Sequence, residues 1–254
     1  MTKITDLKVV NKHLNYDRVS LVNPSTSNYI HIAAEIDKKL TPFFLTTSSR
    51  KKKLIAQCKK WCKELEKISG VIEINLFKAT IIPPGLGEYV KENSNDVHIA
   101  KFDFAILIET HSEKVCEELK NKNIYEKMLE HIKRVASYTN IMSAYNIRRI
   151  NNVNHKKKGV FLFNYFSAKN RQQNLMVWEY TAGWFEEETE LDNSTLLFPL
   201  EEENAKYSII NHCRWDKYID ILPSLIFKKT FKKYVLDNFY ANNVGAQPIL
   251  YRVI

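Results

Sequence analysis

The chain of 254 residues has four cysteines, six glycines and no long apolar run. Cys58 and Cys62 lie four residues apart, with Cys116 and Cys213 far from them, so a disulfide framework is excluded and free buried thiols are expected. No window approaches the ~20 apolar residues of a membrane span. The opening segment MTKITDLKVVNKH has no apolar signal core. We therefore expect a folded cytoplasmic protein without a membrane partner.

Familiar metal and nucleotide motifs are also missing. HExxH, CxxC, the P-loop and GxGxxG are absent, which argues against zinc hydrolases, nucleotide-cradling proteins and dinucleotide-binding proteins at the motif level. His31 and Glu35 share one side of a predicted strand, but they are ~13 Å apart along it. That separation is too large for the pair to chelate one ion unaided. No metal site is expected.

Charge is present in excess of one sign. The chain has 38 Lys+Arg against 29 Asp+Glu and a formal net charge of +9. A basic balance can attract nucleic acid or acidic ligands. Much of the excess stands in the short runs 50–53 and 156–158, which we interpret as solvated surface. Charge alone does not identify a partner.

One order of elements occurs twice along the chain. Strand, helix, strand, strand, helix, strand is predicted from residue 29 and again from residue 160. A βαββαβ unit forms a four-stranded antiparallel sheet with two helices on one face. We therefore predict an α+β fold of two tandem ferredoxin-like units that pack sheet to sheet into one pseudo-two-fold barrel. The predicted parts are an arm at 1–28, unit 1 at 29–150, a linker at 151–157 and unit 2 at 158–254.

Alternation along the strands predicts which face each side chain occupies. In the predicted strand 97–109, the row expected to pack on the helices is Ala100, Phe102, Phe104, Ile106 and Ile108. The opposite row includes Lys101, Asp103 and Glu109, and in the first strand it includes His31, Ala33 and Glu35. A sheet face with alanine, histidine and carboxylates suits a partly polar cavity closed by a second sheet.

Two ferredoxin-like units whose sheets close together resemble the dimeric α/β-barrel superfamily over about residues 29–254. This superfamily includes antibiotic-biosynthesis-type monooxygenases, stress-responsive barrel proteins, haem-degrading monooxygenases and, as tandem single chains, chlorite dismutase-like haem proteins. The strings IPPGLGEYVKE, VFLFNYF, VWEYTAGWF and INHCRWDKY are also similar to a bacterial family of tandem barrels. That second likeness implies no particular activity.

One local motif concerns haem. The stretch KNIYEKMLEHIKRV at 122–135 resembles the second-helix pattern of these families, and by that match His131 stands where some haem-degrading members place their iron ligand. Those members add an asparagine on the first strand and a tryptophan on the second helix. Here the first strand has His31 and Glu35 instead, and no tryptophan is expected near His131. Haem is therefore the alternative, and a cofactor-free barrel is preferred.

The densest polar and aromatic cluster is NHCRW at 211–215. His212 can serve as an acid or base, and Arg214 can hold an anionic oxygen. Alternation places both on one face. The alternative is structural: His212 is a hydrogen-bonded core residue, and Arg214 pairs with a carboxylate such as Asp216 or Asp192.

Asn164 lies inside an otherwise apolar strand, where a buried amide must be satisfied by a ligand, a water or the backbone. The resemblance implies that Asn, Trp and His side chains orient a polyphenolic substrate and stabilise its carbanion. Trp178 and Trp184 also fit a helix-to-sheet core, which is the favoured interpretation. We predict a pocket on the sheet face of unit 2 with catalytic candidates Asn164, His212 and Arg214. The substrate-binding candidates are Tyr165, Trp178, Trp184, His31, Glu35, Lys101 and Asp103.

The sequence thus favours a protein that binds a small organic ligand, with a monooxygenase-like reaction on an aromatic or polyketide-like metabolite as the hypothesis. A homodimer is left open. The other hypothesis is an RNA-binding or protein-interaction module, because RNA-recognition motifs share the βαββαβ order. Their signature strand exposes aromatics. The matching stretch HIAKFDFAILIE has no glycine and carries charges opposite its phenylalanines, so nucleic acid is not expected.

Overall fold

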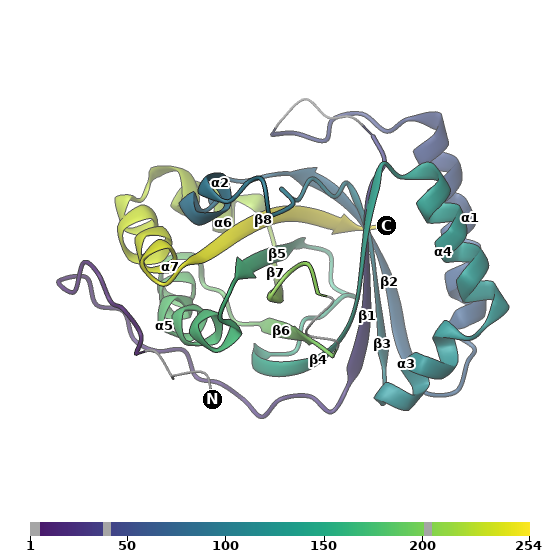
Figure 1. The fold of residues 1–254 in the computed structure, drawn as a ribbon, viewed down its shortest axis with the longest axis horizontal. Helices are drawn as coiled ribbons and strands as arrows, with labels where there is room; N and C mark the ends of the chain where they lie inside the picture. The colour runs from purple at the N-terminus through teal and green to yellow at the C-terminus, as the bar shows by residue number, and fades with distance from the viewer. Residues whose placement is uncertain (1–5, 38–41, 201–204) are drawn as a thin grey trace.

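The structure is a computed structural model that describes residues 6–37, 42–200 and 205–254. Eight strands form one closed barrel in the order β1-β3-β2-β8-β5-β7-β6-β4 (Figure 1). All neighbouring strands are antiparallel. The strands of the first half are β1 (Asn28–Glu35), β2 (Val71–Ile81), β3 (Phe104–Thr110) and β4 (Tyr138–Asn151). Those of the second half are β5 (Val160–Ala168), β6 (Ser194–Pro199), β7 (Ile209–Trp215) and β8 (Val244–Val253).

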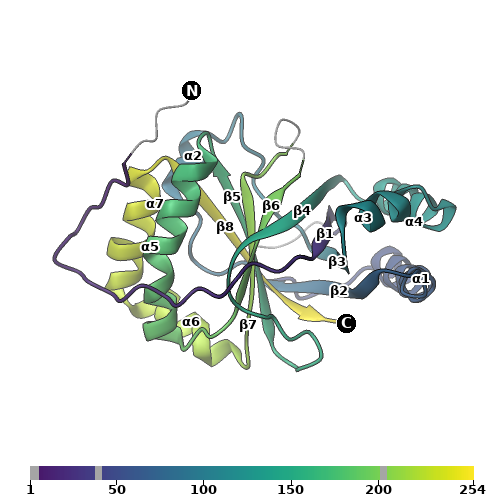
Figure 2. The same ribbon diagram turned by 90° about the horizontal axis from the view of Figure 1, so that it is seen from below.

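Two layers of helices cover opposite sides of the barrel (Figure 2). The first layer contains α1 (Ser49–Leu65), α3 (Glu113–Lys120) and α4 (Asn123–Val135). The second contains α5 (Arg171–Thr189), α6 (Tyr218–Phe227), the π-helix η1 (Phe231–Leu236) and α7 (Asp237–Ala241), and the short α2 (Glu88–Glu92) packs on β8. The predicted fold, two ferredoxin-like units in one α+β barrel, is confirmed.

Helix α1 shows how sequence produces these elements. The Ser48 side chain accepts a hydrogen bond from the backbone N–H of Lys51 and so satisfies one free donor at the helix start. Leu54, Cys58, Cys62 and Leu65 recur at helical spacing and are buried against the sheet. Amphipathic spacing and a cap together fix where this helix lies and which face it buries.

Strand alternation separates three cores. Phe161, Phe163 and Tyr165 of β5 point into the barrel, whereas Val160 and Leu162 point to the second helical layer. On β1, Ile30, Ile32 and Ala34 pack under the first helical layer, as predicted. The barrel interior is thus a separate core between the two sheets.

Two predicted elements differ in the structure. The strand predicted at 97–109 begins only at Phe104, so Ala100 and Phe102 lie in the barrel interior and not under the helices. The Asp103 carboxylate accepts backbone N–H bonds from Ile36 (2.7 Å) and Asp37 (3.0 Å), which anchors this segment across the end of β1. The second helix expected in the second half is divided into α6, η1 and α7.

The arm lies along the second helical layer before the chain enters β1 of the first half (Figure 2). The Lys8 N–H donates to Asn242 Oδ1 (2.9 Å), and the Val10 N–H donates to Asn238 Oδ1 (2.9 Å). A Cβ at Gly183 of α5 would lie 1.8 Å from the Asp17 carbonyl oxygen. A glycine inside this helix is therefore required for the arm to make its close approach.

Among the helices of the described ranges, none combines the length and apolar character needed to cross a membrane.

Candidate functional site

The barrel interior is packed with aromatic rings. The ring centroid of Phe163 lies 4.2 Å from that of His212, 4.7 Å from that of His31, 5.0 Å from that of Phe77 and 5.4 Å from that of Tyr251. Around Phe163, the sheet face that was predicted to line a partly polar cavity is instead a packed aromatic core.

A chain of polar groups crosses this core. The His31 Nε2 lies 3.5 Å from the Tyr165 hydroxyl, which lies 3.3 Å from the Tyr251 hydroxyl, and Tyr251 donates to the Phe102 carbonyl (3.0 Å). The His31 Nδ1 is buried without a hydrogen-bond partner among the described residues. Burial lowers the pKa of His31 to about 3, so this imidazole is neutral at physiological pH. Two predicted site residues, His31 and Tyr165, therefore meet inside the barrel.

The three predicted catalytic side chains do not form one site. Asn164 faces the second helical layer, where its Oδ1 accepts from the Gln247 N–H (2.9 Å) and where it lines two small cavities of about 30 Å³ each. His212 points the other way, into the barrel. Arg214 donates to the carbonyl of Lys158 and to the carboxylate of Asp216, as the structural alternative anticipated. The grouping was mistaken because it counted Asn164 and Tyr165, which lie on opposite faces of β5, as parts of one pocket wall.

The two tryptophans belong to the helix–sheet core. Trp178 lines one of the small cavities beside Asn164. Trp184 is fully buried, and its Nε1 donates to Thr230 Oγ1 (3.0 Å). Both packing positions agree with the favoured interpretation of the sequence.

In the first half, Asp103 is fully buried and forms a salt bridge with Lys51 of α1, whose Nζ lies 2.7 Å away. This pair joins the start of α1 to the start of β3. The location of Asp103 makes it an anchor of the fold, although the sequence had placed it on a cavity wall.

Glu35 and Lys101 lie at the end of the barrel where β1 finishes. The Glu35 Oε1 accepts from the backbone N–H of Lys101 (2.8 Å) and lies 2.9 Å from His98 Nε2. The His98 ring stacks on Tyr138 with centroids 3.6 Å apart. The Lys101 side chain is exposed. The segment around His98 thus covers this end of the barrel.

His131 does not fit the role of a haem ligand. It lies on α4 with its Nδ1 2.6 Å from Arg134 Nη2. Contrary to the expectation from sequence, a tryptophan is close: the Trp61 ring of α1 lies 5.5 Å from the His131 ring, edge on. This imidazole is engaged at the helix surface and lines none of the cavities described here.

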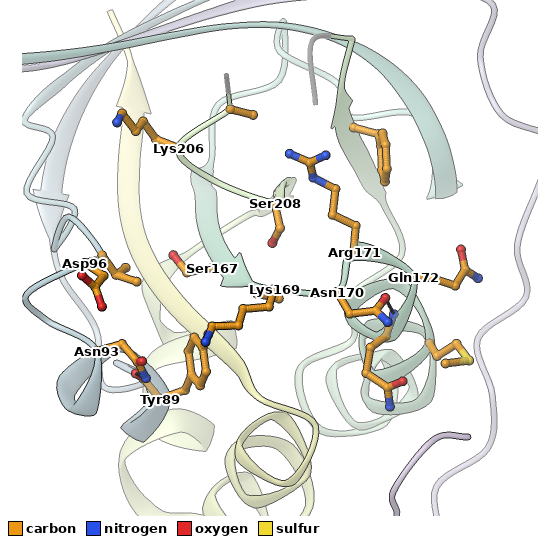
Figure 3. Close-up of a pocket in the computed structure, with 16 residues that line it drawn as sticks. Tyr89, Asn93, Asp96, Ser167, Lys169, Asn170, Arg171, Gln172, Lys206 and Ser208 are labelled. Atoms are coloured by element: carbon orange, nitrogen blue, oxygen red, sulfur yellow. Dashed lines mark hydrogen bonds between the residues drawn. The ribbon is translucent and has the colours of Figure 1, made fainter. Parts of the chain in front are cut away.

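A much larger hollow, which we call the mouth groove, lies where β5 ends and α5 begins (Figure 3). Its volume is about 710 Å³. The labelled side chains come from α2 and the loop after it, from the end of β5, the turn that follows and the start of α5, and from the segment before β7. The lining includes Tyr89, Asn93, Asp96, Val97, Ser167, Lys169, Asn170, Arg171, Gln172, Met176, Phe198, Lys206 and Ser208.

The mouth groove combines positive charge with apolar surface. The described lining residues include three cations, Lys169, Arg171 and Lys206, and one carboxylate, Asp96. The N-terminal end of α5, which carries a partial positive charge, borders the groove, and its cap residue Asn170 accepts from the Gln173 N–H (3.0 Å). Such a surface attracts anions that also carry apolar parts.

Sequence reasoning missed this groove. Its cations stand in the turn after β5, at the first residue of α5 and in the segment before β7, which alternation and helical spacing do not describe. The run SAKNRQQN at 167–174 was the available signal, because it joins a strand end to a helix start with two cations.

At the opposite end of the barrel, the loop 152–159 between β4 and β5 brings His155 against His212, with their Nε2 atoms 2.8 Å apart. The His155 Nδ1 forms a short hydrogen bond with Glu73 of β2. Within the described residues, no group of three or more His, Cys, Asp or Glu side chains is arranged to hold a metal ion. His155 and Glu73 were not predicted, because a lone histidine in a linker carries no periodic signal.

Comparisons with known proteins support the fold. No protein-family model and no curated protein matches the sequence. Among solved structures, an anthrone oxidase-like protein superposes with a TM-score of 0.65 at 9% identity, covering 92% of this chain and 94% of that chain. A protein from Fusobacterium nucleatum, provisionally assigned as a monooxygenase, superposes with a TM-score of 0.53 at 9% identity, covering 90% and 93%. The chain therefore has the dimeric α/β-barrel fold, closed here within one chain.

Proposed function

We propose that this barrel binds an aromatic or polyketide-like acid in the mouth groove and oxidises it as a cofactor-independent, monooxygenase-like enzyme. The observation that carries the binding part is the groove itself. Its volume of about 710 Å³ lies within the ~300–1,000 Å³ that small-molecule sites usually have. The two cavities beside Asn164, at about 30 Å³ each, have room for little more than a water.

The lining chemistry supports the ligand class. Tyr89, Met176 and Phe198 offer apolar contact to a ring system. Lys169 and Lys206 are exposed and form no salt bridge to a carboxylate within the described residues, so their charge is available to a carboxylate or phenolate. An acid with a flat aromatic body satisfies both parts of the surface.

The reaction part draws on the fold shared with an anthrone oxidase-like protein and a provisionally assigned monooxygenase. A cofactor-free oxidation that needs no external reductant converts an activated methylene to a carbonyl. One atom of dioxygen enters the substrate, and the other leaves as water with the two methylene hydrogens. Asp96 is the carboxylate among the described groove residues that can accept one of the two methylene hydrogens as a proton.

The test compares a hydroxyanthrone with its carboxylated analogue, by calorimetric titration and by dioxygen uptake in chelator-treated buffer. We expect the carboxylated compound to bind more tightly, and Lys169→Gln and Lys206→Gln each to weaken it by up to about fivefold, equivalent to ~1 kcal/mol for an exposed ion pair. Lys53→Gln on the exposed face of α1 is the matched control.

Two results would count against the proposal. If neither compound binds, or if the groove variants and the control behave alike, the groove is not the site. If binding is confirmed but no dioxygen is consumed, the binding part stands and the oxidation part is wrong.

A further inference from the structure

A second arrangement of side chains lies at the linker end of the barrel, opposite the mouth groove. His155 from the loop 152–159 covers the barrel end, and its side chain is 5% exposed. Its ring centroid lies 5.6 Å from that of Phe161 and 5.8 Å from that of Phe77. His212 of β7 lies beneath it and stacks on Phe163. Two imidazoles thus meet inside an aromatic enclosure.

The outer nitrogen of each ring has an acceptor. The His212 Nδ1 lies 2.9 Å from the Leu162 carbonyl oxygen, which can only accept, so this nitrogen carries a hydrogen. The His155 Nδ1 faces the Glu73 carboxylate and donates to it. A neutral imidazole has one N–H, so with both Nδ1 atoms protonated the two Nε2 atoms present lone pairs.

These two lone pairs point straight at one another. The Nε2 atoms are 2.8 Å apart, and the ring centroids are 5.1 Å apart with planes inclined by 12°. The centroid separation equals the Nε2–Nε2 distance extended by the two ring radii, so both nitrogens lie on the line between the ring centres. Two lone pairs in this position repel unless a cation lies between them.

Charge and surroundings limit which cation fits. Glu73 supplies one negative charge, because its carboxylate lies against the His155 Nδ1. The enclosing Phe77, Phe161 and Phe163 rings offer no further ligand and a low dielectric. One carboxylate balances a monovalent ion, whereas a divalent ion would leave a buried net charge.

We propose that His155 and His212 form a two-coordinate site for a monovalent d¹⁰ cation, Cu(I), held in a line between the two Nε2 atoms. Histidines that bind metals donate their other ring N–H to a carboxylate or a backbone carbonyl, and Glu73 and Leu162 supply one of each. Imidazole is a ligand that copper accepts. Metal–nitrogen bonds of about 2 Å require the two nitrogens to part by about 1 Å, which a movement of the loop 152–159 can provide.

The ion competes with a proton for the same position. Binding forms two Cu–N bonds and releases the one proton that otherwise bridges the imidazoles, without any change of oxidation state. Protons and the ion compete for the two nitrogens, so binding should weaken in acid. The charged and titratable groups that act on the pair are Glu73 of β2, Lys156 of the loop and His31 of β1. The sequence predicted no metal, because it offered only His31 and Glu35 as ligands.

The test uses the full chain with Cu(I) under ascorbate in competition with bicinchoninate, and Ag(I) as a redox-inert probe. We expect one ion per chain and, from X-ray absorption, two nitrogen ligands and no sulfur, which separates this site from the buried cysteines. His155→Ala, in a loop, should lose about 100-fold or more in affinity, and Glu73→Gln about tenfold, the usual cost of a lost supporting hydrogen bond. His98→Ala, at the other end of the barrel, is the matched control.

Several outcomes would overturn the site. These are no binding by the wild type, equal binding by wild type and His155→Ala, sulfur ligands in the absorption spectrum, or Zn(II) bound more tightly than Ag(I). If nitrogen NMR shows a proton bridging His155 and His212 that neither metal displaces, the pair holds a proton alone. The site lies away from the mouth groove, so none of these results depends on the proposed function.

Discussion

The buried imidazole of His31 should make the protein lose stability in acid over a defined interval. The ordinary pKa of histidine is about 6.5, and burial lowers that of His31 to about 3. Above pH 6.5 both the folded and the unfolded chain hold His31 neutral, and the group contributes nothing to the pH dependence. As the pH falls below 6.5 the unfolded chain binds a proton that the folded chain does not, so the free energy of unfolding decreases.

The size of this loss follows from the shift. Each pH unit between 6.5 and about 3 costs about 1.4 kcal/mol for one such group, or close to 3 kcal/mol at pH 4.5 relative to pH 7. His31→Gln keeps a donor near the Tyr165 hydroxyl but removes the titration. We therefore expect the stability difference between wild type and His31→Gln to change by about that amount between pH 7 and pH 4.5.

Urea unfolding at several pH values measures this change, and it does so independently of any constant loss from the substitution. His111→Gln, at an exposed position, is the control and should follow the wild type. His212, whose pKa is lowered by burial and by the charge of His155, titrates in both proteins and largely cancels. Parallel pH profiles for wild type and His31→Gln would show that the core around His31 admits water or a proton, and the reasoning would fail.

Three further predictions test the packing. Gly183→Ala should displace the arm and expose it to protease, because the new Cβ would lie 1.8 Å from a carbonyl oxygen of the arm. This should hold even though alanine favours a helix by ~1 kcal/mol over glycine. A more stable, protease-resistant variant would contradict the prediction. Phe104→Asp should unfold the protein in a thermal melt, whereas Lys101→Ala, at an exposed position, should change its stability by less than ~0.5 kcal/mol. Equal effects would refute the assignment of Phe104 to the face that packs under the helices. Asp103→Ala should lower the free energy of unfolding in urea by ~3–5 kcal/mol, because it leaves Lys51 charged, buried and unpaired. Adding Lys51→Met should recover part of this loss. If nothing is recovered, the backbone hydrogen bonds to Asp103 are the larger contribution.

The fold was predictable because the periodic spacing of apolar residues specifies its strands and helices. Alternation on β1 and helical spacing on α1 each repeat over several residues, so one misplaced residue does not change the assignment. The prediction failed where side-chain bonds to the backbone override the pattern. Asp103 caps the end of β1 and shortens β3, and nothing in the alternation of FDFAILIE distinguishes that carboxylate from an exposed one.

The site was less predictable, because its parts come from turns. The lysines of the mouth groove and His155 of the loop 152–159 stand outside every periodic segment, and their neighbours in space are distant in sequence. His31 and Ala33 were assigned to the interior row correctly, because alternation fixes direction. Their partners across the barrel depend on strand order and register, which a single sequence does not specify.

The arm has a consequence for how the chain holds together. Residues 6–27 precede the first half, yet they bind the helices of the second through Asn238, Asn242 and the groove over Gly183. The arm is therefore an intramolecular ligand, presented to its receptor at a high effective concentration by the barrel. If the chain were cut within 152–159, the first fragment would bind the second through two separate surfaces, the edges of its sheet and its arm. A split pair made in this way should reassemble bivalently, and removing the arm should weaken reassembly far more than it weakens the uncut protein.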